Sequence, residues 1–187
     1  MDLDEVIRRR RMCRSFSDRP LDPAVVDRLL DRARRAPSAG HTQGWAFLVL
    51  EGRGQLDRFW AASADPDWLA SPTLPGLVRA PAVVVPLTSE TAYRTRYSEA
   101  DKGPDGPGGS WSVPYWTVDA SFATMLLLLG ATAEGLGALF FALRPGAPDR
   151  LRREFGVPDG WDPIGAVAVG WPAPEPGPAG SPARRPR

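Results

Sequence analysis

Residues 8–16 read RRRRMCRSF, and we expect the rest of the chain to be organised around this stretch. Guanidinium groups form paired hydrogen bonds with phosphate oxygens, so one interpretation is a site for a phosphate ester. Residues on a helix are about 100° apart, so Arg10 and Arg14 would share a face there while Arg8 would point elsewhere. The alternative interpretation is a basic helix face exposed to solvent.

The composition limits the classes of protein to consider. The 187 residues fit one domain, for which we expect residues 1–171, followed by a tail rich in proline and arginine over residues 172–187. Lysine and arginine number 23 against 22 aspartates and glutamates, which gives a net charge of +1. This near balance argues against nucleic-acid binding as the main role, although a binder that uses residues 8–14 and the tail is kept as a third hypothesis.

Cysteine and histidine are scarce. The chain has one cysteine, Cys13, and one histidine, His41, so an internal disulfide is ruled out and no metal site is expected. The first residues are charged from Asp2 onward and lack the apolar core of a secretory signal. We therefore expect a cytoplasmic protein.

Apolar periodicity and turn residues predict a mixture of helices and strands. Asp22 and Pro23 mark the start of a helix, because aspartate caps a helix and proline fits its first position. Pro86 argues against regular pairing at the end of its strand. The predicted helices are 3–7, 22–35, 54–63, 115–135 and 147–155, and the predicted strands are 46–50, 82–87, 138–143 and 164–171.

The longest helical pattern, residues 115–135, contains an uncharged stretch over residues 120–133. Those 14 residues fall short of the about 20 that a bilayer-spanning helix needs. The stretch therefore predicts a buried helix and no membrane partner. Because residues 126–129 are apolar all round, we expect this helix to be covered on every side, by the sheet together with a second subunit.

Residues 36–45, APSAGHTQGW, join small residues to hydrogen-bonding ones. Small side chains let the backbone approach a flat ligand closely, and Ser38, His41 and Gln43 could read its polar edge. We interpret the lone histidine as a hydrogen-bonded structural residue rather than a catalyst, because no acid and serine are placed beside it in the sequence.

Residues 93–114, YRTRYSEADKGPDGPGGSWSVP, form a long stretch of charges, glycines and prolines. Loops of this length in a compact domain are often lids over a site. Trp111, Tyr115 and Trp116 close the stretch. Two interpretations stay open: an aromatic wall over a substrate, or a loop pinned to the core by its own aromatic residues.

Four motifs, in order along the chain, resemble landmarks of the flavin-dependent nitroreductase family. Residues 10–16 (RRMCRSF) stand where that family has Arg-Arg-Ser-x-Arg-x-Phe, and residues 37–45 (PSAGHTQGW) stand where it has Pro-Ser-Ser/Ala-x-Asn-x-Gln-Pro-Trp. Gly-Leu-Gly at 135–137 and Gly-Trp-Pro at 170–172 match its later landmarks. The resemblance covers nearly the whole chain.

The resemblance implies an α+β fold, a mainly antiparallel central sheet flanked by helices, in an intertwined homodimer with FMN at the subunit interfaces. It implies a ping-pong reaction in which NADH or NADPH gives hydride to FMN, and FMN gives it to an electron-poor small molecule such as a nitroaromatic or a quinone. The alternative is a flavin-binding or flavin-consuming relative that fragments FMN to make the lower ligand of cobalamin. The flavin would carry the chemistry, so no catalytic side chain is expected.

The resemblance also implies a cofactor site, position by position. Arg10 would hold the FMN phosphate with Arg184 or Arg185, and Arg14 would lie near the pyrimidine edge, where a guanidinium stabilises the reduced ring. Residues 142–143 would pass the central ring, and the turn at residues 37–41 would reach the flavin from the partner chain. The implied cofactor-binding residues are Arg10, Arg11, Met12, Arg14, Pro37, Ser38, Ala39, His41, Ala142, Leu143, Arg184 and Arg185.

Three departures from the family pattern bear on that site. Met12 replaces a serine and removes a hydroxyl from the ribityl-phosphate region. His41 replaces an asparagine and brings a side chain that titrates near neutrality. The chain ends at Arg187, where relatives have a further segment with a tryptophan, so part of the dimer contact or of the flavin-binding clamp is expected to be missing.

Overall fold

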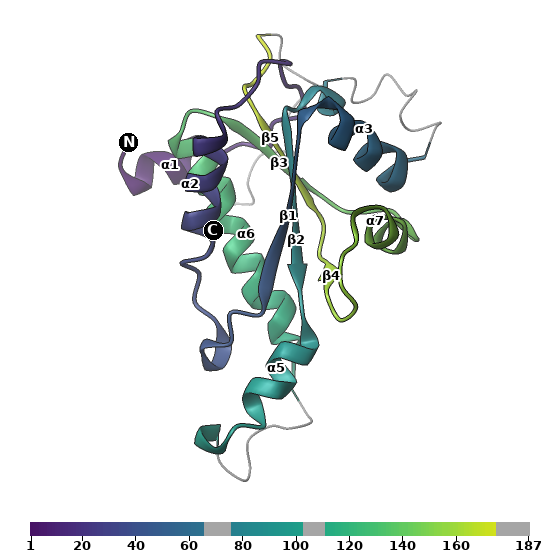
Figure 1. The fold of residues 1–187 in the computed structure, drawn as a ribbon. Helices are drawn as coiled ribbons and strands as arrows, with labels where there is room; N and C mark the ends of the chain where they lie inside the picture. Colours follow the sequence, from purple (N-terminus) through teal and green to yellow (C-terminus); the bar gives the residue numbers. More distant parts are fainter. Residues whose placement is uncertain (66–75, 103–110, 175–187) are drawn as a thin grey trace.

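A computed structural model of the chain describes residues 1–65, 76–102 and 111–174 (Figure 1). Its centre is a sheet of strands paired antiparallel in the order β1-β2-β5-β3, with β4 beside β2. The strands are β1 (Trp45–Glu51), β2 (Ala82–Thr88), β3 (Gly137–Phe141), β4 (Asp162–Pro163) and β5 (Ala166–Gly170). The expected α+β fold with an antiparallel sheet is confirmed.

β2 is central because its sequence, AVVVPLT, can be buried on both faces, and all of its residues are buried. The expectation that Pro86 disturbs regular pairing is wrong for the β1 side, where Pro86 stays in register with Phe47, and is confirmed for the β5 side. On the other side the pairing with β5 ends at Val84, and the Pro86 carbonyl accepts from the Ile164 N–H at 3.1 Å. The missing N–H of Pro86 faces this gap, so no bond to β5 is lost.

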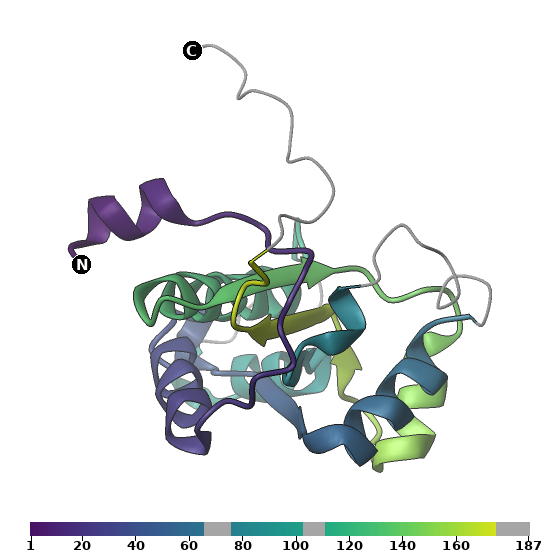
Figure 2. The same ribbon diagram turned by 90° about the horizontal axis from the view of Figure 1, so that it is seen from above.

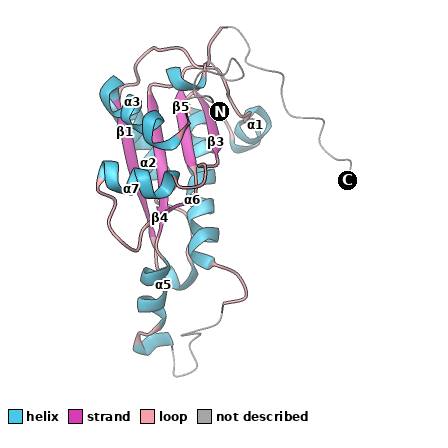
Figure 3. Ribbon diagram, turned by 90° about the vertical axis from the view of Figure 1, so that its right-hand side faces the viewer, coloured by secondary structure: helices cyan, strands magenta, loops and turns pink. Residues whose placement is uncertain are grey.

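Helices cover both faces of the sheet (Figure 3). Asp22 caps α2 as predicted, accepting a hydrogen bond from the Ala24 N–H at 2.9 Å, and Pro23 takes the first helical position. The α-helices are α1 (Leu3–Arg9), α2 (Pro23–Ala33), α3 (Gly52–Ser63), α5 (Glu90–Tyr97), α6 (Tyr115–Ala133) and α7 (Ala147–Phe155). Short 3-10 turns are η1 (Ala39–His41), η2 (Leu77–Arg79) and η3 (Ala100–Lys102).

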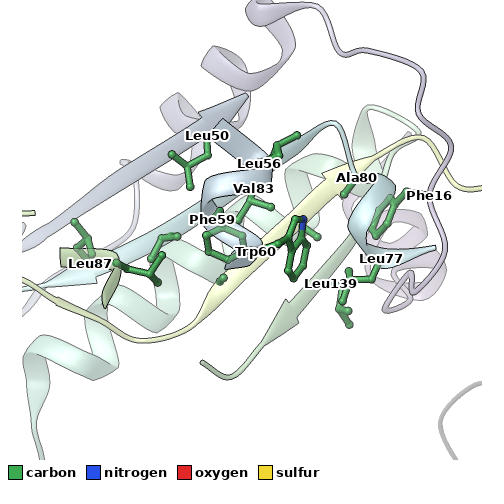
Figure 4. Packing of buried hydrophobic residues seen from close by; sticks show 14 residues of the cluster. Phe16, Leu50, Leu56, Phe59, Trp60, Leu77, Ala80, Val83, Leu87 and Leu139 are labelled. Carbon is green, nitrogen blue, oxygen red and sulfur yellow. The ribbon is translucent and has the colours of Figure 1, made fainter. Parts of the chain in front are cut away.

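The alternation of side chains along the strands divides the core in two. Val83 and Val85 face α3 and α7, where Phe59, Trp60 and Leu139 join the cluster (Figure 4). Residues of α2 and α6 pack against the opposite face of the sheet around Val84. The domain is therefore a three-layer structure with the sheet in the middle.

α6 is apolar along its length, and by length and composition alone it is long enough to cross a membrane. Its buried residues pack instead against α2 and the sheet, as predicted for a core helix. The helix ends where Gly135 takes a positive φ of 75° and the Leu136 N–H bonds back to the Ala131 carbonyl. Within one chain α6 is not covered on every side, because Phe122 is 48% and Met125 46% exposed.

The arginine-rich stretch leaves the helix early, so the expectation that Arg10 and Arg14 share a helix face is wrong. α1 ends at Arg9, and Arg10 already has extended backbone angles. Met12 forms a parallel bridge with Ala138, and the Cys13 N–H donates to the Ala138 carbonyl at 2.9 Å. The stretch therefore runs along the free edge of β3, and Figure 2 shows the chain after α1 passing beside that layer.

Candidate functional site

The Arg10 guanidinium is the clearest sign of a ligand. Its Nη1 atom is buried and has no hydrogen-bond partner within the described part of the chain. Leaving such a donor buried and unpaired is costly, more so because the group is charged. An anion placed beside Arg10 would remove that cost, so this position can bind phosphate.

The neighbouring arginines are engaged differently. Arg9 pairs with Glu5 at 2.6 Å on the solvent side of α1. Arg11 turns back and donates to the carbonyls of Arg8 and Arg10, at 2.7 and 3.0 Å. Arg14 is partly buried, and its Nη1 lies 3.5 Å from the Met12 carbonyl, a long contact that leaves its donors available.

A pocket of about 230 Å³ lies on the α3 side of β3. Its walls are mostly apolar, and they include Ala142 and Leu143, which follow the strand that ends at Phe141. Ser63 also lines it; this residue is 5% exposed and its Oγ has no hydrogen-bond partner in the described structure. The pocket therefore offers apolar walls with one unsatisfied hydroxyl.

The pocket borders the arginine-rich stretch. Leu77 lines the pocket, and the Phe16 N–H bonds to the carbonyl of the preceding residue, Gly76, at 3.0 Å. Leu139, beside the Ala138 carbonyl that holds the Cys13 N–H, lines it as well. Figure 4 shows Trp60, Leu77 and Leu139 on this side of the sheet. One chain thus places Cys13 and Phe16, at the end of the arginine-rich stretch, next to residues that line the same pocket as residues 142–143.

The turn that enters β1 has an unusual backbone. Gly40, His41 and Gln43 all have positive φ, at 62°, 55° and 52°, and two of them are not glycine. Non-glycine residues adopt this conformation only where their surroundings hold it, and such strain gathers at functional sites. The Ser38 Oγ accepts from the Gln43 N–H at 2.9 Å, and the His41 ring contacts the Gln43 amide at 2.7 Å. His41 is therefore hydrogen-bonded at the surface, as the sequence interpretation expected.

A buried carboxylate accepts a hydrogen bond from the inner side of this turn. Asp119 of α6 is 3% exposed, and its Oδ2 accepts from the Ala39 N–H and from the Tyr93 hydroxyl, both at 2.7 Å. Burial, together with the Asp119 carboxylate, raises the pKa of the Tyr93 phenol far above its ordinary value. Tyr93 is thus a permanent donor, and Asp119 connects the turn to α5 and α6.

The two parts of the implied site lie at opposite ends of the sheet. Met12 bridges Ala138, and residue pairing across the sheet aligns Ala138 with Glu51 at the end of β1. Residues 37–43 instead precede Trp45, at the start of β1. Seven residues of strand span about 20 Å. Figure 1 shows the same separation between α1 and the segment that enters β1. One chain therefore does not bring its own turn to its own Arg10.

The expected lid is only partly a loop. Its predicted start is wrong, because residues from Glu90 to Tyr97 form α5 and Tyr93 is fully buried. Residues 103–110, and the tail arginines Arg184 and Arg185, lie outside the described residues.

The lid aromatics pack on one another. Trp111 makes edge-on ring contacts with Tyr97 at 5.5 Å and Trp116 at 5.7 Å, while Tyr115 and Trp116 lie in the first turn of α6. These ring contacts fit the interpretation in which the segment is held by its own aromatic residues. That the segment also covers a substrate stays a prediction.

The sequence pattern does not single out Asp119, Tyr93 or Ser63 as site residues. Asp119 carries a signal, because it is the one charged residue in the apolar sequence of α6. Tyr93 begins the stretch that is expected to be a loop. Nothing in the local pattern distinguishes Ser63 from the other small polar residues of the chain.

A sequence profile described as the Nitroreductase family matches residues 7–171. The chain belongs to the nitroreductase family. A relative from Methanothermobacter thermautotrophicus, named "Putative NADH dehydrogenase/NAD(P)H nitroreductase", is 28% identical over 180 residues, covering 95% of this chain and 81% of the relative. The 5,6-dimethylbenzimidazole synthase of Rhodospirillum rubrum is 28% identical over 186 residues, covering 92% and 83%.

Solved structures give the same fold. The nitroreductase CinD from Lactococcus lactis, in complex with nicotinic acid, superimposes with a TM-score of 0.80 at 17% identity, covering 98% of this chain and 95% of that one. The resemblance seen in the sequence is confirmed, and membership of the nitroreductase family supports an oxidoreductase.

The contact between the turn and Tyr93 can be tested with a glycine substitution. A Cβ on Gly44 would lie 2.5 Å from Cε2 of the buried Tyr93 ring, which has little room to move. We expect Gly44→Ala to lower the free energy of unfolding by about 1–3 kcal/mol, as overpacking does. Denaturant unfolding measures the change.

Gly54→Ala is the matched control, because a Cβ there has nothing within 4 Å and the residue lies inside α3. It should be neutral or stabilising by up to about 1 kcal/mol. Equal stability of the two variants would contradict the described packing of the turn.

Proposed function

We propose that this protein is an FMN-dependent oxidoreductase that takes hydride from NADH or NADPH and passes it to an electron-poor small molecule such as a nitroaromatic or a quinone. The observation that carries the proposal is the buried Nη1 of Arg10, which has no hydrogen-bond partner within the described part of the chain. A phosphate would pair with this donor, and the apolar walls of the pocket on the α3 side of β3 suit a flat aromatic ring. Membership of the nitroreductase family supports it, and a solved protein of the same fold from Clostridium difficile is named an FMN-dependent nitroreductase.

Different residues of the chain would contact different parts of FMN. Arg10 would hold the phosphate, assisted by a tail arginine, and Arg14 would lie at the pyrimidine edge. Ala142 and Leu143 would face the ring from the end of β3. Met12 packs against both halves of the core, so it contributes backbone and apolar contact where a serine would contribute a hydroxyl.

FMN, when bound, supplies hydride transfer in two half-reactions, so no side chain of this chain has to form or break a covalent bond. The chain's own residues bind and orient. A guanidinium fixed at the pyrimidine edge, such as that of Arg14, stabilises negative charge developing there and favours hydride acceptance. The partly buried setting of Arg14 strengthens this interaction, because fewer water molecules screen it.

A homodimer would complete the site. The turn at residues 37–41 and the stretch at residues 10–14 are too far apart in one chain to share a ligand, so a second copy would supply the turn. Phe122 and Met125 leave an apolar face of α6 exposed, which is a surface that a second subunit would bury. The family resemblance implies such a dimer, and this face supports it.

A second candidate function keeps the flavin and changes its fate. The 5,6-dimethylbenzimidazole synthase of Rhodospirillum rubrum is among the relatives of this chain, at 28% identity. In that case the protein would consume reduced flavin in air. Analysis of the products formed from FMN after reduction and exposure to oxygen separates this function from turnover of an external acceptor.

We also propose a cytoplasmic location without nucleic-acid or membrane partners. Cys13 can form no disulfide within the chain and is half-buried, and burial raises the pKa of its thiol. The near-neutral net charge of +1 gives little general attraction to polyanions.

The absorbance spectrum of the purified protein tests the proposed function. We expect flavin bands from bound FMN, loss of those bands with NADH or NADPH in the absence of oxygen, and their return on addition of a nitroaromatic or a quinone. A colourless protein that binds no added FMN would contradict the proposal. Bleaching without return on addition of either acceptor would favour the flavin-consuming alternative.

Arg10→Ala is expected to weaken FMN binding by about 10-fold to 100-fold, because hydrogen bonds to a charged group contribute about 1.5–3 kcal/mol. Arg9→Ala is the matched control. It removes a guanidinium next in sequence that faces solvent and pairs with Glu5, so its FMN affinity should equal that of the wild type. Fluorescence titration with FMN measures both, and equal weakening in the two variants would show a general charge effect instead of a site.

A further inference from the structure

Asp119 is an unusual residue for its position. It is the one charged residue of α6 and is 3% exposed in a helix that is otherwise apolar. Burying a carboxylate is costly, and replacing such a group with an apolar residue of similar volume is often neutral or stabilising. Packing alone therefore does not explain an aspartate at this position. The hydrogen bonds that Asp119 accepts do explain it.

The bonds of Asp119 join three segments. Its Oδ2 receives the Ala39 N–H from the turn and the Tyr93 hydroxyl from α5, each at 2.7 Å. Tyr93 in turn lies against Gly44 at the other end of the turn, where no side chain would fit. The carboxylate and the phenol thus fix both ends of the segment that precedes β1.

The turn needs such support because its backbone is strained. His41 and Gln43 hold positive φ angles of 55° and 52°, which side-chain-bearing L-residues adopt only where their surroundings hold them. Arg96 adds a third anchor, donating from Nε to the Gly40 carbonyl at 2.9 Å, and is itself held by Asp101. With the Ala39 N–H directed inward to Asp119, the exposed groups of the turn are Pro37, His41 and Gln43.

We propose that Asp119 and Tyr93 are positioning residues that hold residues 38–44 in their strained form, so that the turn presents its outer face to the cofactor of the neighbouring subunit. This inference rests on the proposed function. Neither residue touches the cofactor; both act through the turn. Loss of the Asp119 carboxylate frees the Ala39 N–H, and the turn relaxes toward unstrained angles.

Variants at Asp119 separate positioning from general stability. Asp119→Ala removes the acceptor. Asp119→Asn keeps a carbonyl oxygen that can accept from both donors and should restore the turn. Thr124→Val is the matched control, because Thr124 is a buried polar residue of the same helix whose hydroxyl bonds only within α6, to the Ala120 carbonyl at 2.8 Å.

Two measurements use the full-length protein. The first is hydrogen exchange in the FMN-free protein, where Asp119→Ala should speed exchange in the peptide that contains Ala39, and Asp119→Asn and Thr124→Val should not. The second is FMN titration. We expect Asp119→Ala to weaken binding about 10-fold to 100-fold, as loss of an outer-shell positioning contact typically does, and Asp119→Asn to stay within about three-fold of the wild type.

The outcomes are distinguishable. Wild-type protein that binds no FMN would overturn the proposed function, and this inference with it. Wild-type protein that binds FMN, together with an Asp119→Ala variant that binds it equally well, would overturn the inference alone. The same result follows if Thr124→Val weakens FMN binding as much as Asp119→Ala, because then only the stability of α6 would matter.

Discussion

The length of β1 determines the distance between the two segments that are proposed to bind the cofactor, the strained turn and the arginine-rich stretch. Its seven residues carry the chain about 20 Å, from the strained turn at one end of the sheet to the row of Ala138 at the other, where the arginine-rich stretch is bonded. A strand that is paired with β2 along its whole length cannot fold back to bring these parts together. Under the proposed function each chain would therefore carry two half-sites, and two chains would be needed to complete one site.

Each half-site is held by contacts that do not depend on the ligand. Backbone hydrogen bonds to Ala138 and the fully buried Phe16 fix the arginine-rich stretch against the edge of β3. Asp119 and Tyr93 fix the turn against α5 and α6. Both half-sites are thus pre-organised, which reduces the ordering that binding would otherwise require. In the first of them the buried Nη1 of Arg10 has no hydrogen-bond partner among the described residues, and the proposed phosphate would supply one.

The sequence predicted the regular elements well, because their signals are local. The aspartate and proline that open α2, the apolar pattern of α6 and the bounds of α7 are all found in the structure. It failed where a distant contact decides the conformation. Arg10 and Arg14 do not share a helix face, because the pairing of Met12 with Ala138, far along the chain, takes the backbone out of helical geometry there. Asp119 was overlooked because its role depends on Ala39 and Tyr93, which only the fold brings near.

The most direct test of the account is whether subunits with different defects complement one another. Arg10→Ala chains and Asp119→Ala chains, carrying different affinity tags, are assembled together, and the mixed dimers are isolated at an FMN concentration at which neither parent dimer retains flavin. If the half-sites belong to different chains, each mixed dimer contains one intact site, and its flavin absorbance is half that of the wild type. Mixed dimers without flavin would show that each site is built within a single chain, and the account would be wrong.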